Sequence, residues 1–390
     1  MDNKNKPLRV AQILGKMDGG GTEQVVMNYY RSIDRERVQY DFFAFMNSKH
    51  IPAEEIKSLG GGLYLLCGFR MPFRYVRTLA RLLKENHYDI VHCHLGVHSF
   101  LPLLAAKKAG VPVRIIHSSR TSGGMREPLR SALKALLKPL AGLHATERFA
   151  CSELSARWLF GKKPVCEIDD DNAPQCAVRI LRNAVDTKQF AFDSAKRTKL
   201  RGEFKVPSNA LLFVHVGRFC PQKNQQFLID IFSEIVKQHP NSRLIMVGEG
   251  GDMEVIQARI IKAGLLAKAF FAGRRSDVDA FYSAADCLLL PSLYEGVPLV
   301  GIEAQCAGLS CLFSDKIPPE AAITASARFL SLKTPAEDWA FAAIQCARLR
   351  RHSAAAQIAE ACRDIGAEAE KLCSYYIKKH SELHNAAPHN

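Results

Sequence analysis

The stretch LLLPSLYEGVPLVGIEAQCAG, residues 288–308, decides how this sequence is interpreted. An aliphatic run comes first, Pro298 suits the first turn of a helix, and Gly308 suits its end. A surface helix would exclude Gly and Pro, yet Glu295 directly precedes a Gly-Val-Pro turn and Glu303 lies inside the apolar segment that follows. The stretch therefore predicts a buried strand, a loop, and a helix whose first N–H groups and dipole favour an anion.

The alternation of strand and helix recurs along the whole chain. Short β-branched or aliphatic runs are separated by helical patterns, which is typical of βαβ units and parallel sheets. The two series predict an α/β protein with two doubly wound domains, a boundary near residues 181–190, and ligands at the carboxyl ends of the strands. The predicted strands are 8–15, 40–46, 62–68, 89–95, 113–119 and 148–152, then 210–218, 243–250, 269–273, 287–292 and 310–315.

Composition limits the class of protein. The 390 residues, 47% hydrophobic and 24% charged, are enough for two globular cores. No apolar run reaches the roughly 18–20 residues of a membrane span, and the first residues contain no signal core, so we expect no export. The twelve cysteines are scattered, and we expect them to be reduced thiols.

The net charge of +14 is unevenly distributed. Residues 61–140 contain 13 Lys and Arg against 3 Asp and Glu. A one-sided basic field indicates an anionic partner, either nucleic acid or an anionic membrane surface. The basic residues are not interleaved with aromatics as in single-strand nucleic-acid grooves, which disfavours nucleic acid.

Two further motifs suit phosphate. The segment GKMDGGGTE follows the first strand, and its glycines let the backbone approach a ligand closely. In HVGRFCPQKN, residues 215–224, Arg218 and Lys223 follow a strand end, where two cations would suit a diphosphate. Each motif has a plainer interpretation, an ordinary strand-to-helix turn and two solvated surface cations.

Together, the motifs GGGTE, RNAVDTKQF, GRFCPQKN, VGEG, FAGRRSDV and SLYEGVPLVGIEA resemble the retaining GT-B glycosyltransferases of family 4. That family includes many bacterial capsule and exopolysaccharide transferases. The resemblance covers roughly residues 8–330, and the E-x7-E spacing of Glu295 and Glu303 is its most specific part. One departure is Asn183-Ala184, where the family usually has Asn-Gly.

The resemblance implies a GT-B fold, in which two Rossmann-like doubly wound parallel-sheet domains face a central cleft. An acceptor-side domain would span residues 1–185, and a nucleotide-sugar-binding domain would span residues 186–365. Residues 366–390 would form a C-terminal helix and tail that packs back towards the first domain.

The resemblance also implies roles for individual residues. It places Gly20 and Gly21 in a loop of the cleft, and Glu303 on the donor ribose. The other implied roles are catalysis by His117 and Glu295, contacts to the donor diphosphate from Arg218, Lys223, Gly296, Val297, Pro298 and Leu299, and contacts to the base from Phe271, Ala272, Gly273 and Arg274.

The function implied is metal-independent transfer of a hexose-type sugar, with retention, from a nucleoside-diphosphate-sugar to a growing, lipid-linked saccharide. We expect no cofactor, and a UDP-sugar donor ahead of a GDP-sugar. The alternatives are a basic α/β binding protein with a degenerate cleft, and a non-transferase such as an epimerase. The transferase is favoured because all five residues with the implied central roles are present: His117, Arg218, Lys223, Glu295 and Glu303.

Two clusters resemble metal sites. His92 and His94 lie on one face of a predicted strand, but two ligands do not make a zinc site and we predict no third in register. The acidic triplet at 169–171 lies in a polar loop away from the other motifs, so we predict a solvated turn.

The segment REPLRSALKALLKPL, residues 126–140, has leucines at helical spacing, with basic residues largely on the other side. Such a helix can pack its leucines into the domain and leave its cations in water. It can also dock on an anionic membrane. We predict docking, and thus a cytoplasmic protein peripheral to the inner face of the membrane. The docking residues would be Arg126, Arg130, Lys134 and Lys138.

Overall fold

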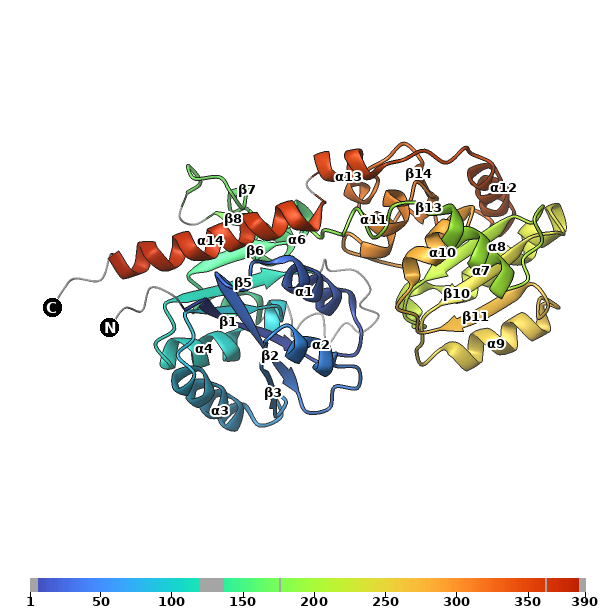
Figure 1. The fold of residues 1–390 in the computed structure, drawn as a ribbon. Coiled ribbons are helices and arrows are strands. Elements are labelled where there is room, and N and C mark those ends of the chain that lie inside the picture. Colours follow the sequence, from blue (N-terminus) through green and yellow to red (C-terminus); the bar gives the residue numbers. More distant parts are fainter. Residues whose placement is uncertain (1–5, 120–136, 175–176, 362, 386–390) are drawn as a thin grey trace. The chain divides into compact units, whose positions relative to one another are not determined.

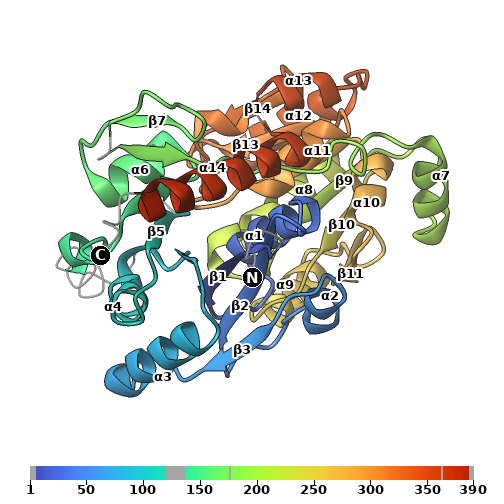
Figure 2. The same ribbon diagram turned by 60° about the vertical axis from the view of Figure 1, so that its left-hand side comes forward.

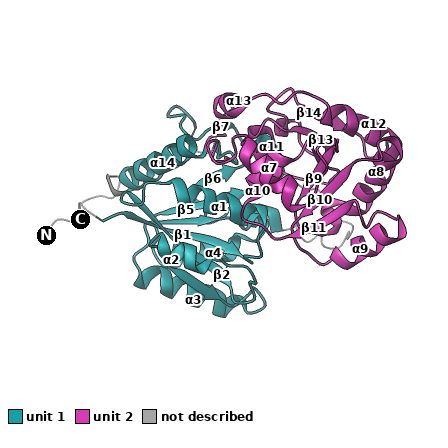
Figure 3. Cartoon of the chain, turned by 45° about the vertical axis from the view of Figure 1, so that its right-hand side comes forward, with its two compact units in different colours: residues 1–183, 365–390 teal, residues 184–364 magenta. Residues whose placement is uncertain are grey.

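The computed structural model describes residues 6–119, 137–174, 177–361 and 363–385, and the chain divides into two compact units (Figure 3). Unit 1 comprises Met1–Asn183 and Ile365–Asn390, and unit 2 comprises Ala184–Asp364. The chain therefore leaves unit 1, forms unit 2, and ends with a helix that belongs to unit 1 again.

Unit 1 contains an eight-stranded sheet with the order β3-β2-β1-β4-β5-β6-β8-β7, and its strand pairs are parallel. The order reverses between β1 and β4, which is the switch point at which doubly wound sheets bind ligands. The strands are β1 (Leu8–Gly15), β2 (Val38–Phe45), β3 (Leu63–Leu66), β4 (Ile90–Cys93), β5 (Val113–Ser118), β6 (Glu147–Ala150), β7 (Val165–Glu167) and β8 (Val178–Ile180).

Helices cover both faces of this sheet (Figures 1 and 2). One face packs apolar side chains such as Ala11 and Val91 against α3 and α4. On the other face, Tyr40 of β2 and His92 of β4 contact Tyr376 of α14, and α1 lies beside α14. The helices described are α1 (Gly21–Ser32), α2 (Ala53–Ser58), α3 (Pro72–Glu85), η1 (Gly96–His98), α4 (Phe100–Lys108), α6 (Glu153–Phe160) and α14 (Ile365–Asn385).

Unit 2 contains a six-stranded parallel sheet with the order β11-β10-β9-β12-β13-β14. Its switch point lies between β9 and β12. The strands are β9 (Leu212–Val216), β10 (Arg243–Val247), β11 (Ala269–Gly273), β12 (Cys287–Leu290), β13 (Ser310–Ser314) and β14 (Ala327–Leu330).

The larger core of unit 2 lies between one face of its sheet and the helices α8, α9 and α12, with Trp339 of α12 fully buried there. On the other face, α10 contacts α7 and α11 (Figure 1). The helices are α7 (Ser194–Glu203), η2 (Pro221–Lys223), α8 (Gln225–Gln238), α9 (Met253–Lys262), α10 (Val278–Ala284), α11 (Leu299–Cys306), η3 (Pro319–Ala321), α12 (Ala336–Ala347) and α13 (Ala355–Glu360).

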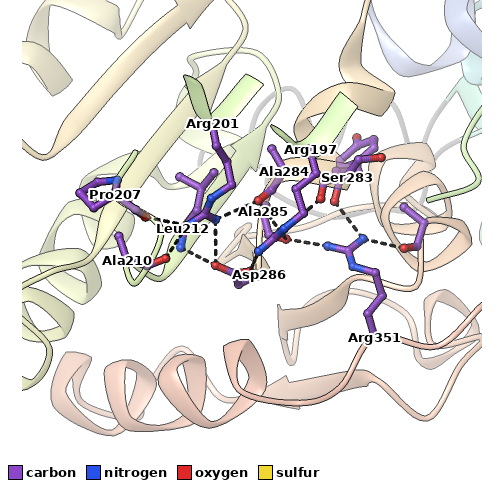
Figure 4. Close-up of polar contacts among 12 residues, drawn as sticks. Arg197, Arg201, Pro207, Ala210, Leu212, Ser283, Ala284, Ala285, Asp286 and Arg351 are labelled. Atoms are coloured by element: carbon purple, nitrogen blue, oxygen red, sulfur yellow. Dashed lines mark hydrogen bonds and ion pairs between the residues drawn. The ribbon is translucent and has the colours of Figure 1, made fainter. Parts of the chain in front are cut away.

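Arginines fix the connection between α10 and β12 (Figure 4). Arg197 donates to the Ala284 carbonyl and to Asp286 Oδ1, both at 2.7 Å. Arg351 donates to the Ala285 and Ala307 carbonyls, both at 2.6 Å. Guanidinium groups satisfy helix-end carbonyls that would otherwise be buried without a donor. Arg351 thus links the end of α10 to the C-cap of α11.

The predicted fold class is confirmed, since both sheets are parallel and doubly wound. Every predicted strand is present, β1 and β11 with the predicted bounds and the others with shifted ends, whereas β7, β8 and β14 were not predicted. These strands have only three or four residues, too few to show a periodic pattern.

The acidic triplet follows β7 and is not simply solvated. Lys371 Nζ of α14 lies 3.3 Å from Asp169 Oδ2, and Lys378 of the same helix pairs with Asp171. Surface ion pairs of this kind contribute little individually. They nevertheless pair two of the three carboxylates with lysines of unit 1.

Among the helices that the structure describes, none combines the length and apolarity needed to cross a bilayer. Of the four predicted docking residues, Arg126, Arg130 and Lys134 lie outside the described residues. Lys138 is described, and its Nζ lies 5.2 Å from the centre of the Trp158 ring. That ammonium therefore lies over an aromatic face of the same unit.

Candidate active site

Two loops meet at the switch point of unit 2, one after β9 and one after β12. Gln222 ties them together, because its carbonyl accepts from the Leu293 N–H at 2.8 Å and its Nε2 donates to the Tyr294 carbonyl at 3.0 Å. Asn224 adds a bond from Nδ2 to the Pro291 carbonyl, also 3.0 Å long. The loops are thus held at a fixed spacing at the carboxyl edge of the sheet.

Lys223 and Glu295 form an ion pair between these loops. Lys223 Nζ lies 2.7 Å from Glu295 Oε1, and the two side chains are only 14% and 10% exposed. Gln222 Nε2 donates to the other carboxylate oxygen at 3.2 Å. A pair this well shielded interacts more strongly than one at the surface, because less water screens it. Lysine suits a phosphate and a carboxylate suits sugar hydroxyls, so both can orient one charged sugar ligand.

Arg218 also follows β9, two residues beyond the strand, and its side chain is exposed. Its carbonyl accepts from Gln225 Nε2 at 2.8 Å, which fixes the backbone from which it projects. The VGEG motif explains how close the next loop comes. A Cβ on Gly250 would lie 2.1 Å from the Phe219 carbonyl oxygen, so no other residue fits there.

Helix α11 starts directly after this ion pair. Pro298 is its N-cap rather than its first helical residue, and the helix begins at Leu299. Gly296 is half-buried and Val297 is buried, so the turn itself is packed against unit 2. The helix begins shortly after Glu295, the partner of Lys223, and a cation near a helix start favours a phosphate.

Glu303 lies further along α11 and is 7% exposed. Burial raises the pKa of this carboxyl to about 7, although the Tyr282 hydroxyl opposes the shift by donating to Oε2 at 2.8 Å. Tyr282 is fixed in turn, because its carbonyl accepts from Arg351 at 3.1 Å. The carboxylate is therefore held in one orientation within the same unit.

The residues expected to contact the base lie at the edge strand β11. Phe271, Ala272 and Gly273 are its last three residues, and Arg274 follows with an exposed side chain. The Phe271 ring lies 5.6 Å from the Phe219 ring, in the loop after β9. The carboxyl ends of β9, β11 and β12 thus all carry predicted site residues in one unit.

Gly20 and Gly21 lie at the switch point of unit 1. Gly20 is the N-cap of α1 and Gly21 is its first residue. The Gly20 N–H donates to Glu23 Oε2 at 2.6 Å, so a carboxylate already satisfies this donor. A Cβ on Gly21 would meet nothing within 4 Å, which leaves the exposed start of the helix open.

His117, near the end of β5, is 2% exposed. Its Nδ1 lies 3.1 Å from His92 Nε2, while its buried Nε2 has no hydrogen-bond partner within the described part of the chain. The prediction that no third histidine lies in register with His92 and His94 is wrong. β4 and β5 are neighbours, and nitrogens of all three rings lie within 4.8 Å of one another.

Sequence analysis also missed the partners of these residues. Gln222 lies in the HVGRFCPQKN motif, in which the sequence predicts roles only for Arg218 and Lys223. No local signal points to three other partners, because each comes from a distant element. These are Tyr282 for Glu303, Gln12 for His94, and Tyr376 for His92. The structure thus brings Lys223 and Glu295 together in unit 2 and His117 together with two further histidines in unit 1.

Two Rossmann-like domains, the second with charged loops at its switch point, define the GT-B class. The structure of HepE from Anabaena in complex with UDP and glucose is similar, with a TM-score of 0.70, 16% identity and coverage of 97% of this chain and 98% of that one. At that identity the likeness shows the fold.

Sequence comparisons identify the family. Residues 19–189 match the family described as Glycosyltransferase Family 4, and residues 196–365 match Glycosyl transferases group 1. EpsF of Bacillus subtilis (strain 168), a provisionally named glycosyltransferase, is 33% identical over 85% of this chain and 86% of its own length. The chain belongs to the family 4 glycosyltransferases.

Two other relatives carry more specific names. An Escherichia coli protein named UDP-Gal:alpha-D-GlcNAc-diphosphoundecaprenol alpha-1,3-galactosyltransferase is 29% identical over 61% of this chain and 60% of its own. CapH of Staphylococcus aureus, named a capsular polysaccharide biosynthesis glycosyltransferase, is 25% identical over 76% of this chain and 79% of its own.

Proposed function

We propose that this protein transfers a sugar, with retention of configuration and without a metal, from a nucleoside-diphosphate-sugar to a lipid-linked saccharide in surface polysaccharide synthesis. The observation that carries the proposal is the shielded Lys223–Glu295 pair directly before α11, with Glu303 further along the same helix. A cation and a helix start suit the diphosphate, and the two carboxylates suit hydroxyls of the sugar and the ribose.

The names of the relatives support the finer parts of the proposal. HepE has been crystallised with UDP and with UDP-glucose, and the Escherichia coli relative is named for a UDP-galactose donor. These names favour UDP over GDP for this chain as well. The same relative is named for a diphosphoundecaprenol-linked acceptor and CapH for capsule synthesis, which supports a lipid-linked saccharide acceptor.

In the proposed reaction an acceptor hydroxyl attacks the anomeric carbon while the bond from that carbon to the diphosphate oxygen breaks. The departing diphosphate takes up the hydroxyl proton on the same face of the sugar, so configuration is retained. Lys223, Arg218 and the start of α11 stabilise the negative charge that develops on the leaving group. Glu295 orients the sugar, and we assign His117 of unit 1 to the reacting carbon.

A panel of nucleotide-sugars tests the proposal. The purified protein should gain thermal stability with one UDP-sugar and slowly hydrolyse it, and proton NMR of a transfer product should show the donor's anomeric configuration. Stabilisation by no nucleotide-sugar would contradict the donor assignment. An inverted product would contradict retention while leaving the family membership intact.

The basic surface of unit 1 supports a position on the cytoplasmic face of the membrane. In the segment leading into α3 and in its first turn, Phe73 is 91% exposed and Met71 is 52% exposed. Arg70, Arg74 and Arg77, all exposed, flank these two side chains. Exposed apolar side chains among arginines fit an anionic bilayer, where each well-placed cation contributes about 1 kcal/mol.

Vesicle co-sedimentation tests the membrane assignment. Binding should rise with the fraction of anionic lipid, fall with salt, and weaken in Phe73→Ser. The matched control is Phe341→Ser, because Phe341 is 60% exposed on α12 of unit 2 and should not matter. Equal recovery in the supernatant with and without anionic vesicles at low salt would contradict the assignment. Glutamine at Arg126, Arg130, Lys134 and Lys138 tests the second basic segment separately.

A further inference from the structure

Three imidazoles converge at the carboxyl edge of the unit 1 sheet. His92 lies on β4, His94 directly follows that strand on the same face, and His117 lies on the adjacent strand β5. The ring centres of His92 and His94 are 4.3 Å apart, and one nitrogen from each of the three rings lies within 4.8 Å of the others.

Partners from other elements orient two of these rings. His92 Nδ1 lies 2.6 Å from the Tyr376 hydroxyl of α14, and His94 Nε2 lies 2.8 Å from Gln12 Oε1 of β1. The amide oxygen of Gln12 only accepts, so His94 carries its proton on Nε2 and presents a lone pair at Nδ1. Histidines that bind metals are commonly fixed in this way, through a hydrogen bond from the ring nitrogen that faces away from the metal.

The chemistry of the cluster suits a transition metal. The 3.1 Å between His92 Nε2 and His117 Nδ1 is close to the separation of about 3.3 Å between two ligands of a tetrahedral zinc with bonds of about 2.0 Å. A neutral imidazole offers one lone pair that can ligate a metal. Neutral nitrogen donors favour zinc, cobalt or nickel over magnesium or calcium.

We propose that His92, His94 and His117 form a three-histidine site for a divalent transition-metal ion of the zinc class. Half-buried His94 provides the accessible side, where the fourth coordination position stays open to water. This site lies in unit 1 and is distinct from the charged loops of unit 2. A consequence rests on the proposed function: because His117 is assigned to the donor sugar, zinc bound here inhibits transfer.

The competing account is a hydrogen-bonded chain from Tyr376 through His92 to His117, in which a shared proton takes the place of the metal. The two accounts differ in measurable ways. A metal requires His94, which is not part of the hydrogen-bonded chain. It also requires the lone pair on His94 Nδ1, which the contact between Gln12 and Nε2 leaves available.

The test uses full-length, tag-free protein treated with EDTA and then freed of chelator, titrated with Co²⁺ in the absence of nucleotide-sugar. The expected result is one Co²⁺ per chain, with the visible absorption of a tetrahedral site, displaced by Zn²⁺. His94→Gln, which can still reach Gln12, should weaken binding by at least about 100-fold, and Gln12→Ala by about 10–100-fold. His239→Gln is the matched control, because His239 contacts Ser242 in unit 2 and should not matter.

No tetrahedral Co²⁺ spectrum, or equal affinity in the parent protein and His94→Gln, would overturn the site and favour the proton-sharing chain. Circular dichroism shows whether each variant is folded. If His94→Gln does not fold, the Co²⁺ affinity of Gln12→Ala distinguishes the metal site from the proton-sharing chain. Inhibition of transfer by Zn²⁺ is measured separately. A site that binds metal without inhibition would overturn only the assignment of His117 to the donor sugar.

Discussion

Six strands of the unit 1 sheet and the six strands of the unit 2 sheet follow the same order, yet their carboxyl edges carry different chemistry. In unit 2 the switch-point loops carry the Lys223–Glu295 pair, with exposed Arg218 beside them. In unit 1 the corresponding edge carries three imidazoles, of which His92 and His117 are buried and His94 is half-buried. One topology can therefore carry charged loops in one unit and a cluster of imidazoles in the other, because the side chains at the carboxyl ends of the strands differ.

The largest effect should come from breaking the pair in unit 2. We expect Lys223→Ala to lower the transfer rate about 10²–10³-fold, since it removes a cation from the leaving group. Glu295→Ala should nearly abolish transfer while the fold stays intact, because this loop carboxylate supports no core. Steady-state kinetics and thermal unfolding of the purified variants provide the measurement.

The control for this pair is Lys237→Ala. Lys237 Nζ also lies 2.7 Å from a carboxylate oxygen, that of Glu234, but the lysine side chain is 67% exposed on α8. The N–O distance is the same, but this pair is exposed and lies within one helix, so the variant should turn over like the parent. Equal losses in Lys237→Ala and Lys223→Ala would mean that ion pairing in general, rather than the switch point, matters.

The next effect concerns the pH dependence of donor binding in unit 2. Burial raises the pKa of Glu303 to about 7, so its carboxylate, which we propose accepts the ribose hydroxyls, is present above that pH and lost below it. Affinity for free UDP should therefore fall as pH drops, by about tenfold at one pH unit below the pKa. Calorimetry between pH 5.5 and about 8.5, a range chosen to span the pKa, provides the measurement.

Tyr282→Phe makes this expectation sharper. The Tyr282 hydroxyl stabilises the Glu303 carboxylate, so its removal should raise the pKa further and move the loss of affinity to higher pH. Glu303→Gln should instead bind UDP weakly at every pH. A pH profile unchanged by both substitutions would exclude Glu303 as the titrating group.

These contacts also show how far sequence reasoning reaches. The parallel, doubly wound fold and the charged switch-point loop follow from strand periodicity and from Gly, Pro and Glu at fixed spacing. The partner of Glu303 lies 21 residues away on another helix, and that of His92 lies 284 residues away on α14. Such pairings depend on how helices cover the sheet faces, which no local spacing encodes. The third histidine was missed because His117 joins the other two only where β5 lies beside β4. Spacing within one strand does not encode that pairing.

A smaller effect is expected on the neutral side of the comparison. His117→Ala should lower turnover by about 3–10-fold, the value of one uncharged hydrogen bond, without changing affinity for free UDP. Lys223→Ala should change both quantities, because it acts on the diphosphate. Pre-steady-state turnover and UDP calorimetry on the two variants separate these patterns. Weakened UDP binding in His117→Ala would contradict the proposal that unit 2 alone binds the nucleotide.

The smallest expected effect is that of EDTA on transfer, which should be none or a slight gain. The diphosphate charge can be met by Lys223, Arg218 and the start of α11, and these groups need no divalent ion to bridge them. In the acidic triplet after β7, Asp169 and Asp171 are paired with Lys371 and Lys378, which disfavours a catalytic ion there. A histidine site of the zinc class predicts that removing metal relieves inhibition rather than stopping turnover. Activity lost in EDTA and restored by Mg²⁺ or Mn²⁺ would contradict the charge assignment in unit 2, whereas restoration by Zn²⁺ alone would move the catalytic charge to the histidines of unit 1.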